Sequence, residues 1–160
     1  MEILSTPIKN FENYICRSNG EIYNLKTKRI MKTHCNKKGY HTIVLKTNGR
    51  RRCAGLHRLL GECFIDNPEN KCDIDHIDRN KSNNDLSNLR WATRQENNEN
   101  KGMYKTNTTG HKHIYTIGTG NCKGHFRYKR KYNNKWYYKQ SKDINVCVEY
   151  KKYLEENIFI

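Results

Sequence analysis

The residues best suited to chemistry lie near the middle of the chain. His76 follows Asp75 directly, and Asn97 occurs later in the same central segment. An imidazole takes up a proton near neutral pH, which makes His76 the best candidate for a general base. The carboxylate of Asp75 and the amide oxygen of Asn97 are hard ligands of the kind that Mg²⁺ prefers, with water and substrate phosphate completing its shell. These residue types suit the hydrolysis of a phosphodiester, which needs an activated water and a way to offset charge on the phosphate.

A general base must also be oriented, usually through its second ring nitrogen. Asn88 precedes a segment that can return as a strand, so its side chain or main chain could reach His76. Each residue alone also has an ordinary structural explanation. An Asp-His pair in a polar loop is more often solvated than catalytic, and asparagines commonly form turns. The catalytic interpretation therefore depends on the joint spacing of the four residues.

The elements that must position these residues can be read from the same segment. Residues 72–77 can form a short strand, residues 78–88 form a polar loop, and residues 89–93 can return as a second strand. Thr93 and Glu96 have the spacing of a capping box, which predicts that a helix starts there. The segment therefore predicts the order strand, loop, strand, helix.

The flanking segments predict further small elements. Residues 1–55 show short strands joined by turns, with hairpin signals at Asn19-Gly20 and Asn48-Gly49. Residues 56–64 place their apolar side chains on one helical face. Residues 126–131 and 136–139 flank Asn133-Asn134 as a hairpin, followed by a helix over residues 143–158 with Cys147, Tyr150, Leu154 and Ile158 directed inward.

Charge is distributed unevenly along the chain. The formal net charge is +15, and it divides into +10 over residues 1–60, −4 over residues 61–100 and +9 over residues 101–160. Basic flanks suit a polyanion such as nucleic acid. An acidic centre would repel phosphate unless a divalent cation neutralised it. Uneven surface charge in a basic protein remains the simpler alternative.

Cysteine usage and hydropathy exclude other classes of protein. The seven cysteines form no CxxC or CxxH pair, so no structural zinc site is expected. No apolar run reaches the ~18–20 residues of a spanning helix, and the first residues do not form a signal peptide. We therefore expect reduced thiols, no membrane partner and a cytoplasmic location, in a host cell if the source is a phage or virus, rather than secretion.

Three motifs closely resemble those of HNH homing endonucleases: Asp75-His76-Ile77-Asp78, Asn83 to Trp91, and Thr93 to Asn97. The resemblance implies an α+β protein with a ββα-metal nuclease core. It implies that His76 is the general base, that Asn88 positions it, and that Asp75 with Asn97 holds one Mg²⁺ or Mn²⁺ per active site. Asn97 at the third motif position corresponds to the HNN variant. The turn after His76 carries Arg79 where such enzymes usually have glycine.

Two weaker resemblances flank this core. Residues 10–53 look like a small module that accompanies homing nucleases. Residues 106–157 are similar to an AP2-type DNA-binding domain, with three strands and a helix, although His113 replaces a glycine and Phe126 a tryptophan. We therefore predict three modules: a β-rich DNA-binding module over residues 1–55, an HNH core over residues 56–101, and an AP2-like domain with a three-stranded sheet and a helix over residues 106–160.

The predicted function is metal-dependent endonucleolytic cleavage of double-stranded DNA, leaving 5′-phosphate and 3′-hydroxyl ends. The favoured state is a monomer that nicks one strand and needs no small-molecule cofactor. The DNA-contacting residues are expected to be Arg50, Arg51, Arg52, Arg79, Lys81, Arg127, Lys129 and Lys131. A DNA-binding regulator with an inactive nuclease core is the main alternative, and a basic structural protein that binds nucleic acid without catalysis is the third.

Overall fold

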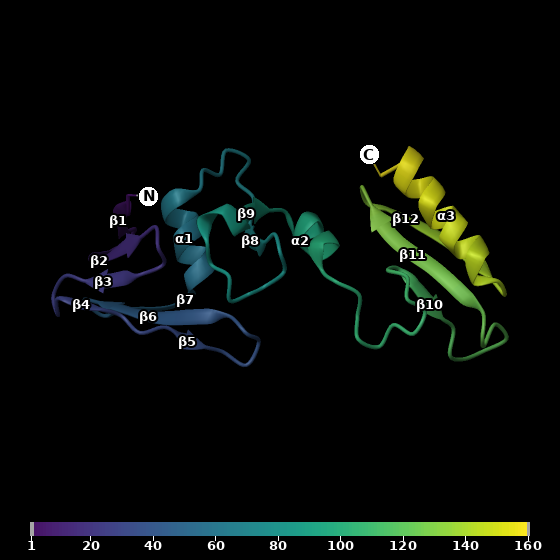
Figure 1. The fold of residues 1–160 in the computed structure, drawn as a ribbon, viewed down its shortest axis with the longest axis horizontal. Helices are drawn as coiled ribbons and strands as arrows, with labels where there is room; N and C mark the ends of the chain where they lie inside the picture. Colours follow the sequence, from purple (N-terminus) through teal and green to yellow (C-terminus); the bar gives the residue numbers. More distant parts are fainter. Residues whose placement is uncertain (1, 160) are drawn as a thin grey trace. The chain divides into compact units, whose positions relative to one another are not determined.

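The computed structural model describes residues 2–159. The chain divides into two compact units between Lys101 and Gly102. We call the part before this boundary unit 1 and the part after it unit 2. Both combine small antiparallel sheets with helices (Figure 1), which confirms the predicted α+β class. Within residues 2–159, no helix is long and apolar enough to cross a bilayer.

Unit 1 begins with two small antiparallel sheets, as the turn signals predict. The first contains β1 (Ser5–Ile8), β2 (Phe11–Arg17), β3 (Ile22–Asn24) and β4 (Arg29–Ile30), paired in that order. The second contains β5 (His34–Cys35), β6 (His41–Thr47) and β7 (Arg50–Gly55). Gly20 adopts a φ of +86° and Gly49 one of +78°. Both Asn-Gly hairpins are thereby confirmed, because their turns require this left-handed backbone.

Helix α1 (Leu56–Phe64) organises the interior of unit 1 (Figure 1). It contacts strands of both N-terminal sheets and also the hairpin that follows it. Leu59 and Leu60 are completely buried, as the helical periodicity predicts. Residues before and after the module boundary predicted at residue 55 therefore share one hydrophobic core.

The rest of unit 1 has the predicted order of strand, loop, strand and helix. It consists of β8 (Asp73–His76), the short 3₁₀ helix η1 (Leu86–Asn88), β9 (Leu89–Ala92) and α2 (Arg94–Asn100). Strands β8 and β9 form a two-stranded antiparallel sheet. Helix α1 can pack closely on this sheet because Gly61 has no side chain: a Cβ atom there would clash with Ile74.

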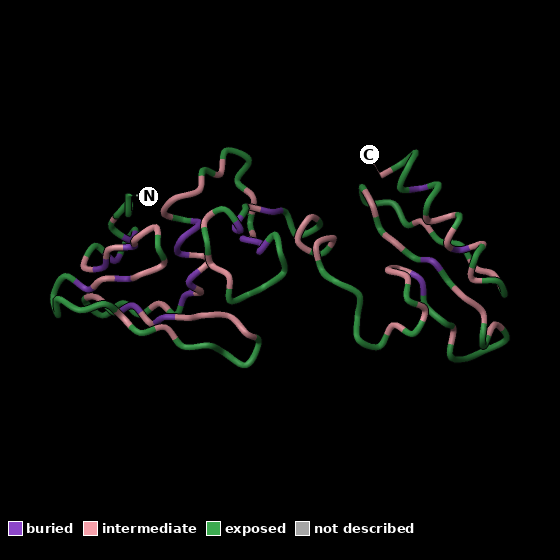
Figure 2. Tube along the Cα trace, viewed as in Figure 1, coloured by how far each residue is buried: buried purple, intermediate pink, exposed green. Residues whose placement is uncertain are grey.

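Unit 2 contains one antiparallel sheet and one helix. The sheet comprises β10 (Ile114–Thr116), β11 (Phe126–Tyr132) and β12 (Lys135–Ser141), and α3 (Ile144–Asn157) packs on β11 and β12. Asn133 and Asn134 both have positive φ in the β11–β12 turn. Figure 2 shows few buried positions in this unit, and Tyr128, Cys147 and Leu154 are among them. The prediction for Ile158 is wrong, because it follows the helix and is 38% exposed.

Candidate active site

Three polar side chains lie buried around the β8–β9 hairpin. Asp75, His76 and Asn88 are 7%, 4% and 8% exposed, respectively. Asp75 is paired with Arg90 across the two strands, and His76 with Leu89. Burying polar groups costs free energy unless they are hydrogen-bonded. Their joint burial therefore makes this hairpin a candidate functional site, in which hydrogen bonds must hold the polar groups in place.

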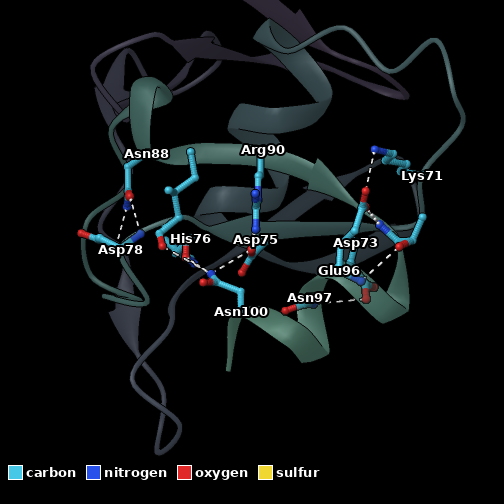
Figure 3. A network of polar contacts seen from close by, with 12 residues as sticks. Lys71, Asp73, Asp75, His76, Asp78, Asn88, Arg90, Glu96, Asn97 and Asn100 are labelled. Atoms are coloured by element: carbon cyan, nitrogen blue, oxygen red, sulfur yellow. Dashed lines mark hydrogen bonds and ion pairs between the residues drawn. The ribbon is translucent and has the colours of Figure 1, made fainter. Parts of the chain in front are cut away.

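Strand alternation separates the roles along β8. Successive side chains point to opposite faces, so Asp73 and Asp75 share one face while Ile74 and His76 share the other. Helix α2 contacts β8 and β9, and it begins with the predicted capping box between Thr93 and Glu96. This cap sets the residue at which α2 starts. Figure 3 shows Asn97 and Asn100 of this helix lying beside the labelled residues of β8.

The carboxylate of Asp75 is held through one oxygen. Its Oδ2 accepts hydrogen bonds from Arg90 Nε and Nη2, at 3.2 and 3.0 Å, and from Asn100 Nδ2 at 2.9 Å. Asn100 Nδ2 also donates to the main-chain oxygen of His76 at 2.9 Å. These bonds fix the orientation of the carboxylate. Among the described residues, no hydrogen bond is recorded for Asp75 Oδ1, which leaves that oxygen for a ligand.

The side chain of Asn97, which is predicted to hold a metal together with Asp75, is hydrogen-bonded to Asp73. Its Nδ2 donates to Asp73 Oδ2 at 3.2 Å, and Arg94 forms an ion pair with the same oxygen at 3.2 Å. A carboxylate can only accept a hydrogen bond, so it holds the nitrogen side of the amide. The amide oxygen of Asn97 consequently points away from Asp73, on the side of Asp75 (Figure 3).

Asn88 organises the loop that follows His76 and makes no recorded hydrogen bond to its imidazole. Its main-chain oxygen accepts from Ile77 N at 2.9 Å. Its side chain accepts from Asp78 N at 3.0 Å and donates to Asp78 Oδ1 and Asn83 O, both at 2.9 Å. Asn88 therefore fixes the direction in which the chain leaves His76, by contacts with main chain and loop.

The loop carboxylate of Asp78 is also held by its neighbours. A hydrogen bond from Asn83, followed by bonds from the backbone of Asn80 and from Asn88, lowers the pKa of Asp78. Asp78 therefore remains charged near neutral pH and closes the turn around Arg79. Arg79 adopts a left-handed φ of +67°, which explains why a glycine is usual at this position of the motif.

The imidazole of His76 has one recorded polar contact, with Asn84. The distance from His76 Nε2 to Asn84 Oδ1 is 3.4 Å. The amide oxygen can only accept, so a hydrogen bond here requires the hydrogen on Nε2 and leaves Nδ1 without one. Asn84 and Asn100 were not among the predicted site residues. Asn100 lies one helical turn from Asn97, and this spacing is the signal that could have identified it.

The residues present fit a hard divalent cation. Asp75 Oδ1 and the amide oxygen of Asn97 offer two oxygen ligands, and Mg²⁺ typically uses few protein ligands and completes its shell with water and phosphate. Within residues 2–159, no group of three or more His, Cys, Asp or Glu side chains is placed to hold a metal. Water and substrate would therefore have to complete the shell of an ion bound by Asp75 and Asn97.

The predicted DNA-contacting residues of unit 1 differ in exposure and in whether they are paired with an acidic side chain. Arg50 and Arg51 are exposed on β7, where they line a shallow basic depression with Lys26 and Lys46. Arg52 is instead engaged by Glu62, with Nη2 to Oε2 at 2.8 Å. This pairing makes Arg52 a weaker candidate for phosphate contact than its two neighbours.

Lys81 is likewise engaged within unit 1. Its Nζ donates to Lys38 O at 2.9 Å and lies 4.6 Å from the ring centroid of Tyr40. Lys81 thus ties the loop of the β8–β9 hairpin to the turn before β6.

The three predicted contact residues of unit 2 share one face of the sheet. Arg127, Lys129 and Lys131 are exposed on β11, whereas Tyr128 between them is fully buried. Their cross-strand partners on β12 are Gln140, Tyr138 and Trp136, respectively. The result is an open face that combines cations with exposed aromatic rings, opposite the face that α3 covers.

Comparisons with known proteins agree with this geometry. A family model described as HNH endonuclease matches residues 54–99. The DNA endonuclease I-HmuI of Bacillus phage SP01 is 39% identical over 95 residues, covering 59% of this chain and 55% of that protein. The H-N-H endonuclease F-TflII of Escherichia phage T5 is 32% identical over 117 residues, covering 72% of this chain and 56% of that protein.

A solved structure on DNA binding and cleavage by the HNH homing endonuclease I-HmuI superposes with a TM-score of 0.57 and 38% identity. The superposed region covers 62% of this chain and 57% of the chain in that structure. The chain spans between 23% and 56% of the length of the curated relatives it matches. Residues 54–99 therefore form an HNH endonuclease domain, with homing endonucleases among its homologues.

Proposed function

We propose that this chain is a metal-dependent DNA endonuclease of the homing type. It hydrolyses phosphodiester bonds and leaves 5′-phosphate and 3′-hydroxyl ends. The observation that carries the proposal is the buried Asp75–His76 pair at the end of β8, held by α2 within an HNH endonuclease domain. It offers a general base next in sequence to a carboxylate, one oxygen of which has no hydrogen-bond partner among the described residues.

His76 is the general base that accepts the proton of the attacking water. With the hydrogen on Nε2 directed at Asn84, its Nδ1 is the nitrogen that receives a proton from the attacking water. Asn88 fixes the loop behind the ring, and Asn100 fixes the main-chain oxygen of His76. Asp75 and Asn97 would hold a divalent ion, Mg²⁺ or Mn²⁺, which when bound would supply positive charge to offset the charge on the phosphate.

Double-stranded DNA is the proposed substrate, held by basic surfaces in both units. In unit 2, the open face of the sheet offers Arg127, Lys129 and Lys131 to the phosphate backbone or base edges, in the manner of an AP2-like domain. In unit 1, Arg50 and Arg51 provide a second basic surface. One active site per chain implies that a monomer nicks a single strand.

Cleavage of supercoiled plasmid tests the proposal. Purified wild-type protein and His76→Ala are incubated with Mg²⁺, with Mn²⁺ to relax specificity, and with EDTA. Exposed His34 provides the matched control, as His34→Ala. Metal-dependent open circles, produced by wild type and His34→Ala but lost in His76→Ala, support the proposal. Linear product would overturn the single-strand cut. Salt-sensitive DNA binding without cleavage would support the regulator instead.

A further inference from the structure

Three aromatic rings from separate segments of unit 1 meet at His76. The rings of His57 and His76 have centroids 5.0 Å apart, those of Tyr40 and His57 are 5.1 Å apart, and those of Tyr40 and His76 are 6.1 Å apart. Tyr40 precedes β6, His57 is the second residue of α1, and His76 ends β8. Such spacings are those of aromatic side chains in contact.

His57 is unsuited to be a second base. Its Nδ1 is buried and has no hydrogen-bond partner among the described residues. Burial, followed by the nearby charges of His76 and Arg58, lowers the pKa of His57 to about 4. The ring is therefore neutral near pH 7 and adds no positive charge beside His76. What remains is a flat neutral surface against which another ring can lie.

The His57 ring also lies close to Gly55. A Cβ atom at residue 55 would lie 2.6 Å from His57 Cε1 and 3.0 Å from Nδ1. Gly55 has an ordinary φ of −71°, so glycine is needed there for space and not for backbone freedom. Tyr40 is braced in turn by the ammonium group of Lys81, 4.6 Å from its ring centroid.

The polar contacts of His76 are too few to fix its ring. The distance of 3.4 Å to Asn84 is long for a hydrogen bond, and it constrains only one ring nitrogen. A general base acts only within hydrogen-bond reach of its proton. Packing against neighbouring rings can supply the orientation that this single contact does not.

We propose that His57 and Tyr40 are positioning residues whose rings form a seat for the imidazole of His76, with Gly55 providing the space in which His57 lies. The inference rests on the proposed function, in which His76 is the base. It assigns His57 a role through shape and contact, with no proton transfer of its own.

Substitutions at residue 57 separate contact from chemistry. His57→Ala removes the seat, and we expect kcat to fall by roughly tenfold to a hundredfold with little change in KM, since small misplacements of a catalytic group cost up to about 10²-fold. His57→Phe restores a flat neutral ring and should recover most of that loss. Gly55→Ala, which pushes the His57 ring aside, should lower kcat in the same direction. Tyr40→Leu tests the seat where His57→Ala does not fold.

A second readout does not depend on cleavage. In ¹H–¹³C NMR spectra, the ring protons of His76 should shift in His57→Ala and Tyr40→Leu, because the ring currents of their neighbours are lost, and should stay near the wild-type position in His34→Ala. Failure of the nuclease proposal would leave this result intact. The proposal is overturned if His57→Phe lowers kcat as much as His57→Ala does. It is also overturned if His57→Ala changes neither kcat nor the His76 signals.

Discussion

The two units of the chain place their polar groups in opposite ways. All the buried Asn, Asp and His side chains within residues 2–159 lie in unit 1, namely Asn24, Asp75, His76 and Asn88. In unit 2, by contrast, three cations point outward: Arg127, Lys129 and Lys131 line the open face of the sheet. A buried polar group costs free energy unless its partners are in place, whereas an exposed lysine or arginine costs little.

This difference indicates a division of labour. Unit 1 holds the side chains of Asp75 and Asn88 and the main-chain oxygen of His76 by hydrogen bonds, and such fixed geometry is what a catalytic site requires. Unit 2 offers exposed charges and exposed rings, which suit a long polyanion with many weak contacts. We therefore propose that unit 1 carries out the chemistry and that unit 2 provides much of the binding.

The largest effect should follow from removing the cations of the open face. We expect the triple change of Arg127, Lys129 and Lys131 to Gln to weaken DNA binding by roughly tenfold to a hundredfold. The salt dependence of binding should fall by about one per lost phosphate contact. Fluorescence anisotropy at several salt concentrations measures both quantities. The control replaces Lys142, Lys151 and Lys152 with Gln, which removes the same number of charges. An equal loss of DNA affinity in the control would contradict a specific role for the open face.

The burial of His57 should make the stability of unit 1 depend on pH. The pKa of His57 is lowered to about 4 in the folded protein, mainly by burial, so below about pH 6.5 the unfolded chain binds a proton that the folded chain does not. Stability should consequently decrease as the pH falls from about 6.5 to 4, and less steeply in His57→Phe. Chemical denaturation across this range gives the comparison. Parallel curves for the two proteins would contradict the burial of His57.

A smaller effect should come from the cap of α2. Thr93→Ala removes the side chain that accepts from Glu96 N at 3.1 Å, and it should lower the free energy of unfolding of unit 1 by about 1 kcal/mol. Thr93→Ser keeps the hydroxyl and should lose much less. NMR signals of Tyr128 report on unit 2, and they should not change in either variant.

The smallest effect concerns two left-handed residues, one in each unit. Arg79 and His113 have φ of +67° and +69°. Glycine tolerates this conformation, so Arg79→Gly should gain roughly 0.5 kcal/mol. His113→Gly should gain less, because the His113 ring also contacts Tyr128 edge-on at 6.4 Å. Thermal unfolding checks both, and a larger gain at His113 would contradict this ranking.

Much of the fold could be predicted from local signals. The Asn-Gly turns, the capping box of Thr93 and the apolar face of α1 each depend on neighbours in the sequence, and each is confirmed. The sharing of one core across residue 55 could not be predicted in this way. It depends on α1 contacting several sheets at once, which is a property of the assembled unit.

The candidate site shows the same limit. The residue types and spacing of Asp75, His76, Asn88 and Asn97 are visible in the chain, but their partners are not. That Asn100 holds Asp75 depends on how α2 lies across β8, and that His57 contacts His76 depends on the packing of α1. Arg52 reads as part of a basic run, and only the structure shows its pairing with Glu62.

The division of labour is tested most directly by single-turnover cleavage of one labelled duplex at increasing protein concentration. The duplex carries a site that the wild-type protein cuts. We expect the Arg127, Lys129 and Lys131 triple variant to need more protein but to reach the wild-type rate at saturation. We expect His76→Ala to bind normally and to cut at no concentration. A triple variant that stays slow at saturation, or a His76→Ala protein that cuts, would contradict this division of labour.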